Sequence, residues 1–396
     1  MEDIKNYYRI LRALLIHYLV FKTKIILFYF KFQKENFIKK EKFNLKKKSI
    51  LVLNPIRGYP EFSNSLKKTK LNILIHNFIF EKKFFSYLLP IKKKKFYEYT
   101  LKKKSKFENF IISIYKKNLF IYLNFLKKKY NIEYIIVFAI HYKSEVFWDE
   151  VSKNLNIKYL IYHRESQYAS PKEIMFTKKM LSKVSPFKGY KIFVYNQIAK
   201  KVFIDSGYVK NDKIIVNGPI RTDKLYSSKI KIKKKNIVLF YIFGTGMGLG
   251  YMTGQSDITH SKFKNFGWNN LLENTYKILF KLAKEFKNHK FICKGKYAGM
   301  IMSRHIAMKK KFGNIPNVIF KSKEKDYEFL KNSKAVISFG STTMFEAMIL
   351  KKKLFIPFFN EPLDKKYKNN VPFEELKKFK FVKKKKRIYI ETSKKS

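Results

Sequence analysis

Short apolar runs recur along the chain, and segments of helical period follow many of them. A continuous apolar run is typical of a parallel strand, because helices cover both faces of such a sheet. In the first half, the predicted buried strands are Ile50–Leu53, Leu71–His76, Tyr134–Ala139, Tyr159–Tyr162, Lys191–Tyr195 and Ile214–Val216. Ser144–Leu155 and Gln197–Ser206 predict helices, and Gly207 predicts the end of the second one.

The alternation starts again after the lysine-rich stretch Ser227–Lys235. The second set of predicted elements comprises Ile237–Phe243, a helix around Asn270–Phe286, Lys290–Cys293, a helix after Met300, Val318–Phe320, Tyr327–Asn332 and the unit Ala335–Phe359. Two successive β/α alternations predict an α/β protein with two Rossmann-like, doubly wound parallel sheets that face each other across a cleft.

This pattern divides the sequence into five parts. We expect a basic, aromatic N-terminal accessory segment at 1–48 and a first Rossmann-like domain at 49–226. A linker at 227–235 leads to a second Rossmann-like domain at 236–380, and a basic tail at 381–396 follows. Ligands of doubly wound sheets bind beyond the carboxyl ends of the strands, so the loops that follow strands are the first places to look for a site.

The unit Ala335–Phe359 combines a buried strand, a hydroxyl-bearing turn, a helix and a second strand. Gly340 lets the backbone turn, and Ser341, Thr342 and Thr343 open the helix. The first N–H groups of a helix lack intrahelical partners, so with three hydroxyls and the positive end of the helix dipole they can bind a phosphate. A plain helix cap is the alternative for one isolated turn. The position of this turn, late in a second β/α domain, favours phosphate binding.

Two further features of the second half point to the same ligand. Glu346 lies on the first turn and a half of the helix, where it could accept hydrogen bonds from ribose hydroxyls or only interact with the helix dipole. Gly244, Thr245 and Gly246 begin a glycine-rich loop after a predicted strand. The loop lacks the third glycine of the dinucleotide fingerprint and the Lys-Ser/Thr ending of a P-loop. It is therefore either a cleft loop that approaches a ligand closely or a simple flexible loop.

The first half offers a candidate acid–base group at the end of the predicted strand Tyr159–Tyr162. His163 can act as a general base near neutral pH, Glu165 lies close to it in sequence, and Arg164 between them can neutralise phosphate oxygens. The alternative is a surface histidine beside a local Arg–Glu pair. The position at a strand end favours a functional role.

Arg221 lies in the loop that follows Ile214–Val216. Arginine is scarce in this sequence, which has seven arginines among 87 basic residues. Arg221 could form an ion pair with Asp223 between the domains or reach a pyrophosphate, and the sequence does not separate these roles.

The formal net charge of +58 suggests an anionic partner. The shortage of arginine argues against nucleic acid, because arginine is the side chain that binds phosphate and base edges with two hydrogen bonds. Attraction to an anionic membrane surface fits better. The single cysteine, Cys293, excludes an intramolecular disulfide and a cysteine-based zinc site.

No cleavable signal peptide is evident at the N-terminus. Ile10–Phe32 is apolar, but charged residues interrupt it, so we do not expect a spanning helix. This segment is either an interfacial helix or an ordinary first helix followed by a buried strand.

The order of these pieces resembles the GT-B glycosyltransferases, which have two Rossmann domains. In particular, it is similar to bacterial surface-carbohydrate transferases of capsule and lipopolysaccharide biosynthesis and, more distantly, to CDP-glycerol glycerophosphotransferases. Ile214–Leu225 resembles the G-x-P-R-x-D element of the latter family, with Ile220 inserted between Pro219 and Arg221. Val336–Phe358 resembles the donor-phosphate turn and helix of the second domain.

The resemblance implies a role for each matching residue. Gly340, Ser341, Thr342 and Thr343 would contact the donor phosphates, and Glu346 would contact the ribose. Many retaining members carry a second glutamate eight residues before the one at Glu346, and this chain has Ser338 there. An inverting displacement is therefore expected. Phe339-Gly340 replaces the aspartate and aromatic residue that usually precede the serines of the glycerophosphotransferases, which argues against a glycerophosphate donor.

The resemblance implies a glycosyltransferase that moves a sugar from a nucleotide-sugar to a cell-surface glycan or lipid-linked acceptor. Apart from the nucleotide-sugar substrate, we expect no cofactor and no metal, because the sequence has no Asp-x-Asp triplet. Arg221 or Arg164 would stabilise the leaving diphosphate, and His163 or Glu165 would take the acceptor proton. The expected location is the cytoplasm, with peripheral contact on the inner face of the membrane.

Three alternatives remain at this point. A CDP-glycerol-type glycerophosphotransferase would share the fold. A nucleotide-sugar epimerase would need no acceptor. A basic nucleic-acid- or membrane-binding protein would belong to a different class and would bind in a steeply salt-dependent way.

Overall fold

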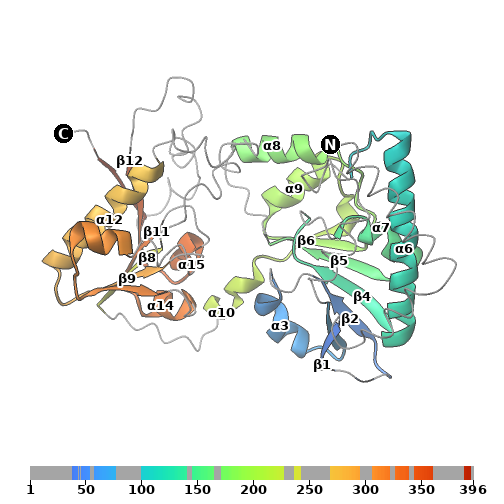
Figure 1. Cartoon of the computed structure of the whole chain (residues 1–396), viewed down its shortest axis with the longest axis horizontal. Helices are drawn as coiled ribbons and strands as arrows, with labels where there is room; N and C mark the ends of the chain where they lie inside the picture. The colour runs from blue at the N-terminus through green and yellow to red at the C-terminus, as the bar shows by residue number, and fades with distance from the viewer. Residues whose placement is uncertain are drawn as a thin grey trace. The chain divides into compact units, whose positions relative to one another are not determined.

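The computed structural model describes residues 38–42, 44, 46–53, 58–76, 100–140, 145–164, 171–226, 236–241, 268–294, 306–321, 326–338, 343–359 and 388–393. The chain forms two units (Figure 1). The first comprises Met1–Tyr168 and Thr177–Arg221, and the second comprises Ala169–Phe176 and Thr222–Ser396. Both units are built on parallel sheets, as the alternation of apolar runs and helical segments predicts.

The first unit has a seven-stranded sheet with the order β1-β3-β2-β4-β5-β6-β7. Its strands are β1 (Ile38–Lys42), β2 (Ser49–Val52), β3 (Asn72–His76), β4 (Ile132–Val137), β5 (Lys158–Tyr162), β6 (Lys191–Val194) and β7 (Ile214–Val216). All neighbours pair in parallel except β1, which pairs antiparallel with β3 at the edge. Because the chain turns to opposite sides after β2 and β4, the topological switch point lies between these two strands.

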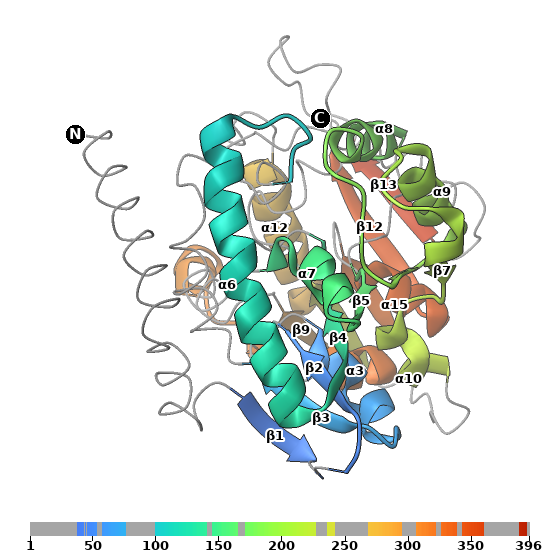
Figure 2. The ribbon, with the colours of Figure 1, turned by 90° about the vertical axis from the view of Figure 1, so that its right-hand side faces the viewer.

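Helices cover both faces of the first sheet. They are α3 (Tyr59–Lys67), α6 (Lys106–Tyr130), α7 (Trp148–Asn154), α8 (Pro171–Leu181), which the two units share, and α9 (Gln197–Asp205). Helix α6 lies along one face beside α7 (Figure 2). On the other face, Tyr59 and Leu66 of α3 pack into a cluster with β2, β3 and β4. This double cover explains why the strands are continuous apolar runs.

Helix α6 is the longest described helix of the first unit, and its ends carry clear signals. Ser105 and Glu108 form a reciprocal capping box at its start. Asn131, with φ 51°, ends it in the left-handed conformation that asparagine tolerates better than most residues. Its buried face includes Ile112, Tyr115, Leu119, Tyr122, Leu123, Leu126 and Tyr130, at the three- and four-residue spacing of a core-facing helix.

The second unit has a six-stranded sheet, parallel throughout, with the order β10-β9-β8-β11-β12-β13. Its strands are β8 (Ile237–Tyr241), β9 (Lys290–Lys294), β10 (Val318–Lys321), β11 (Ala335–Ser338), β12 (Lys353–Phe359) and β13 (Ile388–Ser393). Its helices are α10 (Asp223–Tyr226), α12 (Trp268–Glu285), residues 306–312, α14 (Asp326–Asn332) and α15 (Thr343–Ile349). If the strands are numbered 1 to 6 along the chain from β8 to β13, their order across the sheet is 3-2-1-4-5-6. This is the order of dinucleotide-binding Rossmann sheets.

Two strands lie where the sequence predicts accessory segments. β1 falls within 1–48, and β13 falls within the expected basic tail at 381–396. β1 reads Ile-Lys-Lys-Glu-Lys, which suits a charged edge strand, and β13 carries β-branched and aromatic residues in a lysine-rich context. Neither shows the continuous apolar run by which the inner strands are recognised. Ile10–Phe32 and the expected linker Ser227–Lys235 lie outside the described residues.

Within the part of the chain that the structure describes, we find no helix with the length and apolar character needed to cross a membrane.

Candidate functional site

The strongest candidate site lies at the carboxyl ends of β8 and β11 in the second unit. These strands are neighbours in the sheet, with Tyr241 paired with Ser338 at their last residues. The chain moves outward through β9 and β10 after β8, and to the other side through β12 and β13 after β11. The two strands therefore flank the topological switch point, where doubly wound sheets bind their ligands.

Ser338 joins the two strand ends directly. Its side chain is buried, with 1% exposed, and its hydroxyl donates a hydrogen bond of 3.4 Å to the Tyr241 carbonyl. The serine that replaces the expected second glutamate thus bonds to the end of the neighbouring strand. This contact fixes the points from which the two following loops leave the sheet.

Both loops that the sequence singles out leave the sheet here. Gly244, Thr245 and Gly246 follow β8, while Gly340, Ser341 and Thr342 connect β11 to α15. These six residues lie outside the described part of the chain, so their predicted contacts stay predictions. The paired strand ends show that both segments start from adjacent positions.

The start of α15 is described, and two predicted site residues lie there. Thr343 is its first residue and is 2% exposed. Glu346 follows in the first turn and is 7% exposed. A carboxylate is rarely buried to this extent unless polar or charged groups surround it. Met344 and Ala347 are buried as well, so α15 packs closely beside the end of β11. The arrangement places a hydroxyl and a carboxylate beside the turn predicted to bind phosphate.

Lys294 is a residue of this sheet edge that the sequence analysis missed. It ends β9, where it pairs with Tyr241 on one side and with Lys321 on the other. Its side chain is only 4% exposed, and its ammonium lies 5.5 Å from the centre of the Phe329 ring. A buried ammonium beside the switch point can contribute positive charge toward a phosphate. The signal was a lysine directly after the apolar run Lys290–Cys293, which is hard to recognise among so many lysines.

The candidate acid–base group of the first unit lies at the end of β5. His163 follows the strand, its backbone N–H donates to the Phe193 carbonyl at 2.9 Å, and its ring centre lies 5.4 Å from that of Phe203. The side chain has no exposed area, so the imidazole does not contact solvent in this structure. Arg164 is half-buried, and its backbone N–H donates a hydrogen bond to the Phe138 carbonyl at 3.2 Å. Glu165 lies outside the described residues.

The loop that precedes Arg221 is tied to the same strand end. The hydroxyl of Tyr162, the last residue of β5, donates to the Gly218 carbonyl at 2.9 Å and accepts a hydrogen bond from the N–H of Ile220. Gly218 has a φ of +73°, which favours glycine. Arg221 then lies in a short 3-10 turn, Ile220–Thr222, and the position of its side chain is not described. The structure brings the two backbone segments together, and the role of the arginine stays a prediction.

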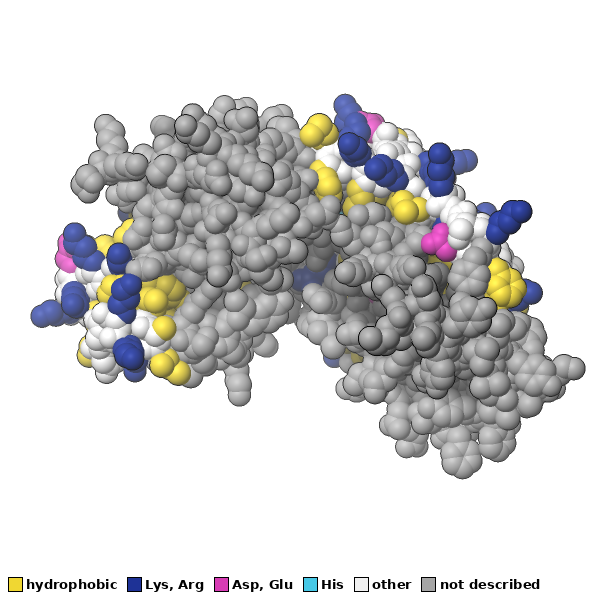
Figure 3. Space-filling view, turned by 45° about the horizontal axis from the view of Figure 1, so that its top comes forward, with side chains coloured by type: hydrophobic (Ala, Val, Ile, Leu, Met, Phe, Trp, Pro, Cys, Tyr) yellow, Lys and Arg dark blue, Asp and Glu magenta, His cyan; other side chains and the backbone are white. Residues whose placement is uncertain are grey.

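Lysine and arginine outnumber Asp and Glu among the described side chains on the face shown in Figure 3. They are scattered over the face in Figure 3, with few Asp or Glu among them. This excess of basic side chains agrees with the net charge of +58.

No protein-family model matches this chain, and neither does any curated protein. Among solved structures, a UDP-GlcNAc 2-epimerase from Methanocaldococcus jannaschii is 14% identical, with 87% of this chain and 89% of that chain covered and a TM-score of 0.47. A glycosyltransferase from Rickettsia africae is also 14% identical, with 82% of each chain covered and a TM-score of 0.40. A UDP-GlcNAc 2-epimerase from Neisseria meningitidis bound to UDP-GlcNAc is 13% identical, with 81% of this chain and 84% of that chain covered and a TM-score of 0.44. Similarity at this level carries no conclusion about reaction or substrate, and these neighbours include both epimerases and a transferase.

Proposed function

We propose that the second unit binds the phosphates of a nucleotide-linked substrate at the carboxyl ends of β8 and β11. The observation that carries this proposal is the pairing of Tyr241 with Ser338 at the switch point of a sheet with the order 3-2-1-4-5-6. The glycine-rich loop begins at Gly244, three residues after Tyr241, and the hydroxyl turn begins at Gly340, two residues after Ser338. Backbone N–H groups and hydroxyls of such turns bind phosphate, and Lys294 adds a cation at the same edge.

The reaction we propose is transfer of a sugar from a nucleotide-sugar to a cell-surface glycan or lipid-linked acceptor, with inversion and without a metal. Gly340, Ser341, Thr342 and Thr343 would bind the leaving diphosphate, together with Lys294 and either Arg164 or Arg221. Glu346 would accept hydrogen bonds from the ribose. His163 or Glu165 would take the proton of the acceptor hydroxyl. Of these two, Glu165 is the better proposal, because His163 is fully buried.

A location on the cytoplasmic face of an anionic membrane belongs to the same proposal. Lipid-linked and surface-glycan acceptors are found there, and lysines attract a protein to anionic lipids within a Debye length of the surface.

A nucleotide-sugar epimerase is the second candidate, because it needs the same nucleotide site and the same sheet order. It differs in its products. The transferase consumes donor only when an acceptor is present, whereas the epimerase converts the donor sugar alone.

The experiment that tests this proposal has two stages. A thermal-shift panel of UDP-, GDP-, CDP- and CMP-linked compounds identifies the donor, since a ligand at 100 times its Kd stabilises the folded state by about 2.7 kcal/mol. The selected donor is then incubated with the protein, with and without glycan acceptors, and the products are separated. Donor isomerised without acceptor would support the epimerase. If no nucleotide stabilises the protein, both candidates fail.

A further inference from the structure

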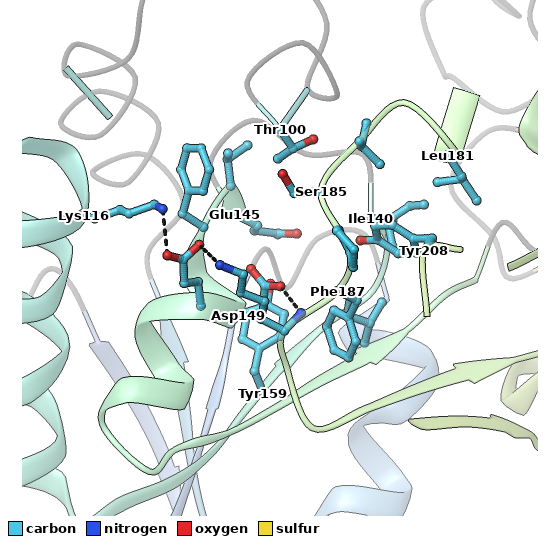
Figure 4. A pocket seen from close by; sticks show the side chains of 18 of the residues that line it. Thr100, Lys116, Ile140, Glu145, Asp149, Tyr159, Leu181, Ser185, Phe187 and Tyr208 are labelled. Carbon is cyan, nitrogen blue, oxygen red and sulfur yellow. Dashed lines mark hydrogen bonds and ion pairs between the residues drawn. The ribbon is translucent and has the colours of Figure 1, made fainter. Parts of the chain in front are cut away.

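The first unit contains a cavity of about 150 Å³ beside the loop that follows β4 (Figure 4). Ala139 and Ile140 of that loop, the start of α7, β5 and the segment after α8 form its walls. A cavity of about 150 Å³ in another protein holds a benzene molecule. The space therefore has room for one six-membered ring, whose substituents would extend through the open side of the cavity, and it is too small for a nucleotide.

The walls of this cavity are fastened together independently of any ligand. Leu101 and Val184 form an isolated antiparallel bridge, and the Ser185 N–H donates to the Thr100 carbonyl at 2.7 Å. The Lys188 N–H donates to the Asp149 carboxylate at 2.8 Å, which ties the segment after α8 to α7. The cavity is thus a built feature of the first unit.

Basic and acidic residues are equal in number around the cavity, and burial raises the pKa of one of the acidic groups, the Asp149 carboxyl. Three lysines (Lys104, Lys116 and Lys188) and three carboxylates (Glu145, Asp149 and Glu150) line it, whereas basic residues outnumber acidic ones by 87 to 29 in the whole chain. Glu150 bridges two of the lysines, with 2.7 Å to Lys116 and 3.0 Å to Lys188. A lining with as many acidic as basic residues favours a neutral ligand over a strongly charged one.

Hydroxyls and one of these carboxylates, that of Glu145, provide hydrogen-bonding groups in the cavity wall. Thr100, Ser185 and Tyr208 line the cavity, and burial, together with the Asp149 charge, raises the pKa of Tyr208, which keeps its hydroxyl neutral. Glu145 is 8% exposed and offers carboxylate oxygens as acceptors. Phe147 and Phe187 supply apolar walls. A ligand that fits these groups carries several hydroxyls around a ring whose faces are apolar.

We propose that this cavity is a binding site for one neutral polyol ring, of which a pyranose sugar is the natural class. The site is distinct from the nucleotide site proposed in the second unit, because every lining residue belongs to the first unit. It does not depend on that nucleotide site and is tested without nucleotide.

Ligand-observed NMR and calorimetry on the full chain test this proposal with defined probes. The probes are glucose, N-acetylglucosamine and myo-inositol, with inorganic phosphate and methylammonium as charged comparisons. We expect at least one polyol to bind with a Kd in the millimolar range and to bind more tightly than either charged probe. Glu145→Gln and Ser185→Ala should each weaken that binding by about tenfold, which corresponds to about 1.4 kcal/mol. Asp205→Asn, which changes a carboxylate outside the cavity, should leave it unchanged.

Several outcomes would overturn the proposal. They are no polyol binding by the folded wild-type protein at 50 mM ligand (roughly ten times a weak millimolar Kd), tighter binding of a charged probe, or equal binding by wild type and both cavity variants. Far-ultraviolet circular dichroism confirms the fold of each variant before titration. If Glu145→Gln does not fold, Ser185→Ala decides, because it removes one hydroxyl from a half-buried position.

Discussion

At the scale of single residues, Glu133 links β4 to β5 and to Lys48, the residue directly before β2. It lies in β4, and its carboxylate is 2.6 Å from the Lys48 ammonium and 3.2 Å from that of Lys158 in β5. The hydrogen bond from Lys48 is the largest cause that lowers the pKa of Glu133 from 4.5 to about 2. Because the pKa is lower in the folded state, the contribution to stability is present above pH 4.5 and is lost as the pH falls toward 2.

We therefore expect Glu133→Gln to lower the free energy of unfolding at pH 7 by about 1 kcal/mol at most, since both lysines are partly exposed. The difference from wild type should shrink as the pH falls to about 3. Urea unfolding followed by Trp148 fluorescence in a Trp268→Phe background measures this in the first unit. A difference that is the same at pH 7 and pH 3 would show that the ion pairs are not its cause.

Glu346 gives the residue-scale prediction for the proposed nucleotide site. If its carboxylate binds ribose hydroxyls, Glu346→Gln should weaken the affinity for a nucleoside diphosphate by about tenfold, since hydrogen bonds to charged groups contribute about 1.5–3 kcal/mol. The affinity for free pyrophosphate should not change. Glu328→Gln on the exposed side of α14 is the matched control. Calorimetric titrations check both affinities, and an equal loss for both ligands would contradict a ribose contact.

For single residues, the local sequence does not predict whether a side chain is buried or reaches a site. A strand-end histidine suggests a base, yet His163 is buried against Phe203, because burial depends on how α9 packs. Lys294 is the reverse case. Its place after an apolar run is a weak signal among so many lysines, and the pairing of β9 with β8 is what brings it beside the switch point. Local sequence gives the residue types, whereas tertiary packing decides which of them reach a site.

At the scale of elements, the inner strands were predictable to within two or three residues. Ile214–Val216 forms β7 with the predicted bounds, and the runs at Tyr159–Tyr162 and Lys191–Tyr195 differ from β5 and β6 by one residue at one end. Burial on both faces produces an uninterrupted apolar run, which is a strong local signal. β1 and β13 lack this signal because edge strands tolerate charge.

The start of α7 was predicted too early. The helix begins at Trp148 and not at Ser144, because Phe147 has a left-handed φ of 67°.

The capping box of α6 gives a prediction at the scale of an element. The Ser105 hydroxyl accepts a hydrogen bond from the Glu108 N–H at 3.1 Å, and the Glu108 carboxylate accepts one from the Ser105 N–H at 3.0 Å. Ser105→Ala should lower the stability of the first unit by about 1 kcal/mol, because an N–H at the helix start loses its partner. Urea unfolding followed by Trp148 fluorescence, again with Trp268→Phe, measures the loss. Ser113→Ala, an exposed serine within α6, serves as the control, and an equal effect of both changes would refute the capping role.

At the scale of the whole molecule, the sequence supports two α/β units, and the structure contains two parallel sheets. What the repeat of β/α units could not supply is the strand order. The order decides which strand ends meet, and it follows from long-range packing that no local window contains. The pairing of β8 with β11 is therefore the main contribution of the structure to the functional account, because it brings two separate sequence signals to one sheet edge.

The most direct test of the central claim is a calorimetric titration of the best nucleotide from the panel into wild-type protein and into the double variant Ser341→Ala, Thr342→Ala. The matched control is Ser113→Ala, Ser182→Ala, which removes two exposed hydroxyls of the first unit that bond only to nearby carbonyls. If these turn hydroxyls bind the phosphates at the switch point, the double variant loses at least about tenfold in affinity while the control keeps the wild-type value. An unchanged affinity in a folded double variant would contradict the phosphate site at the ends of β8 and β11.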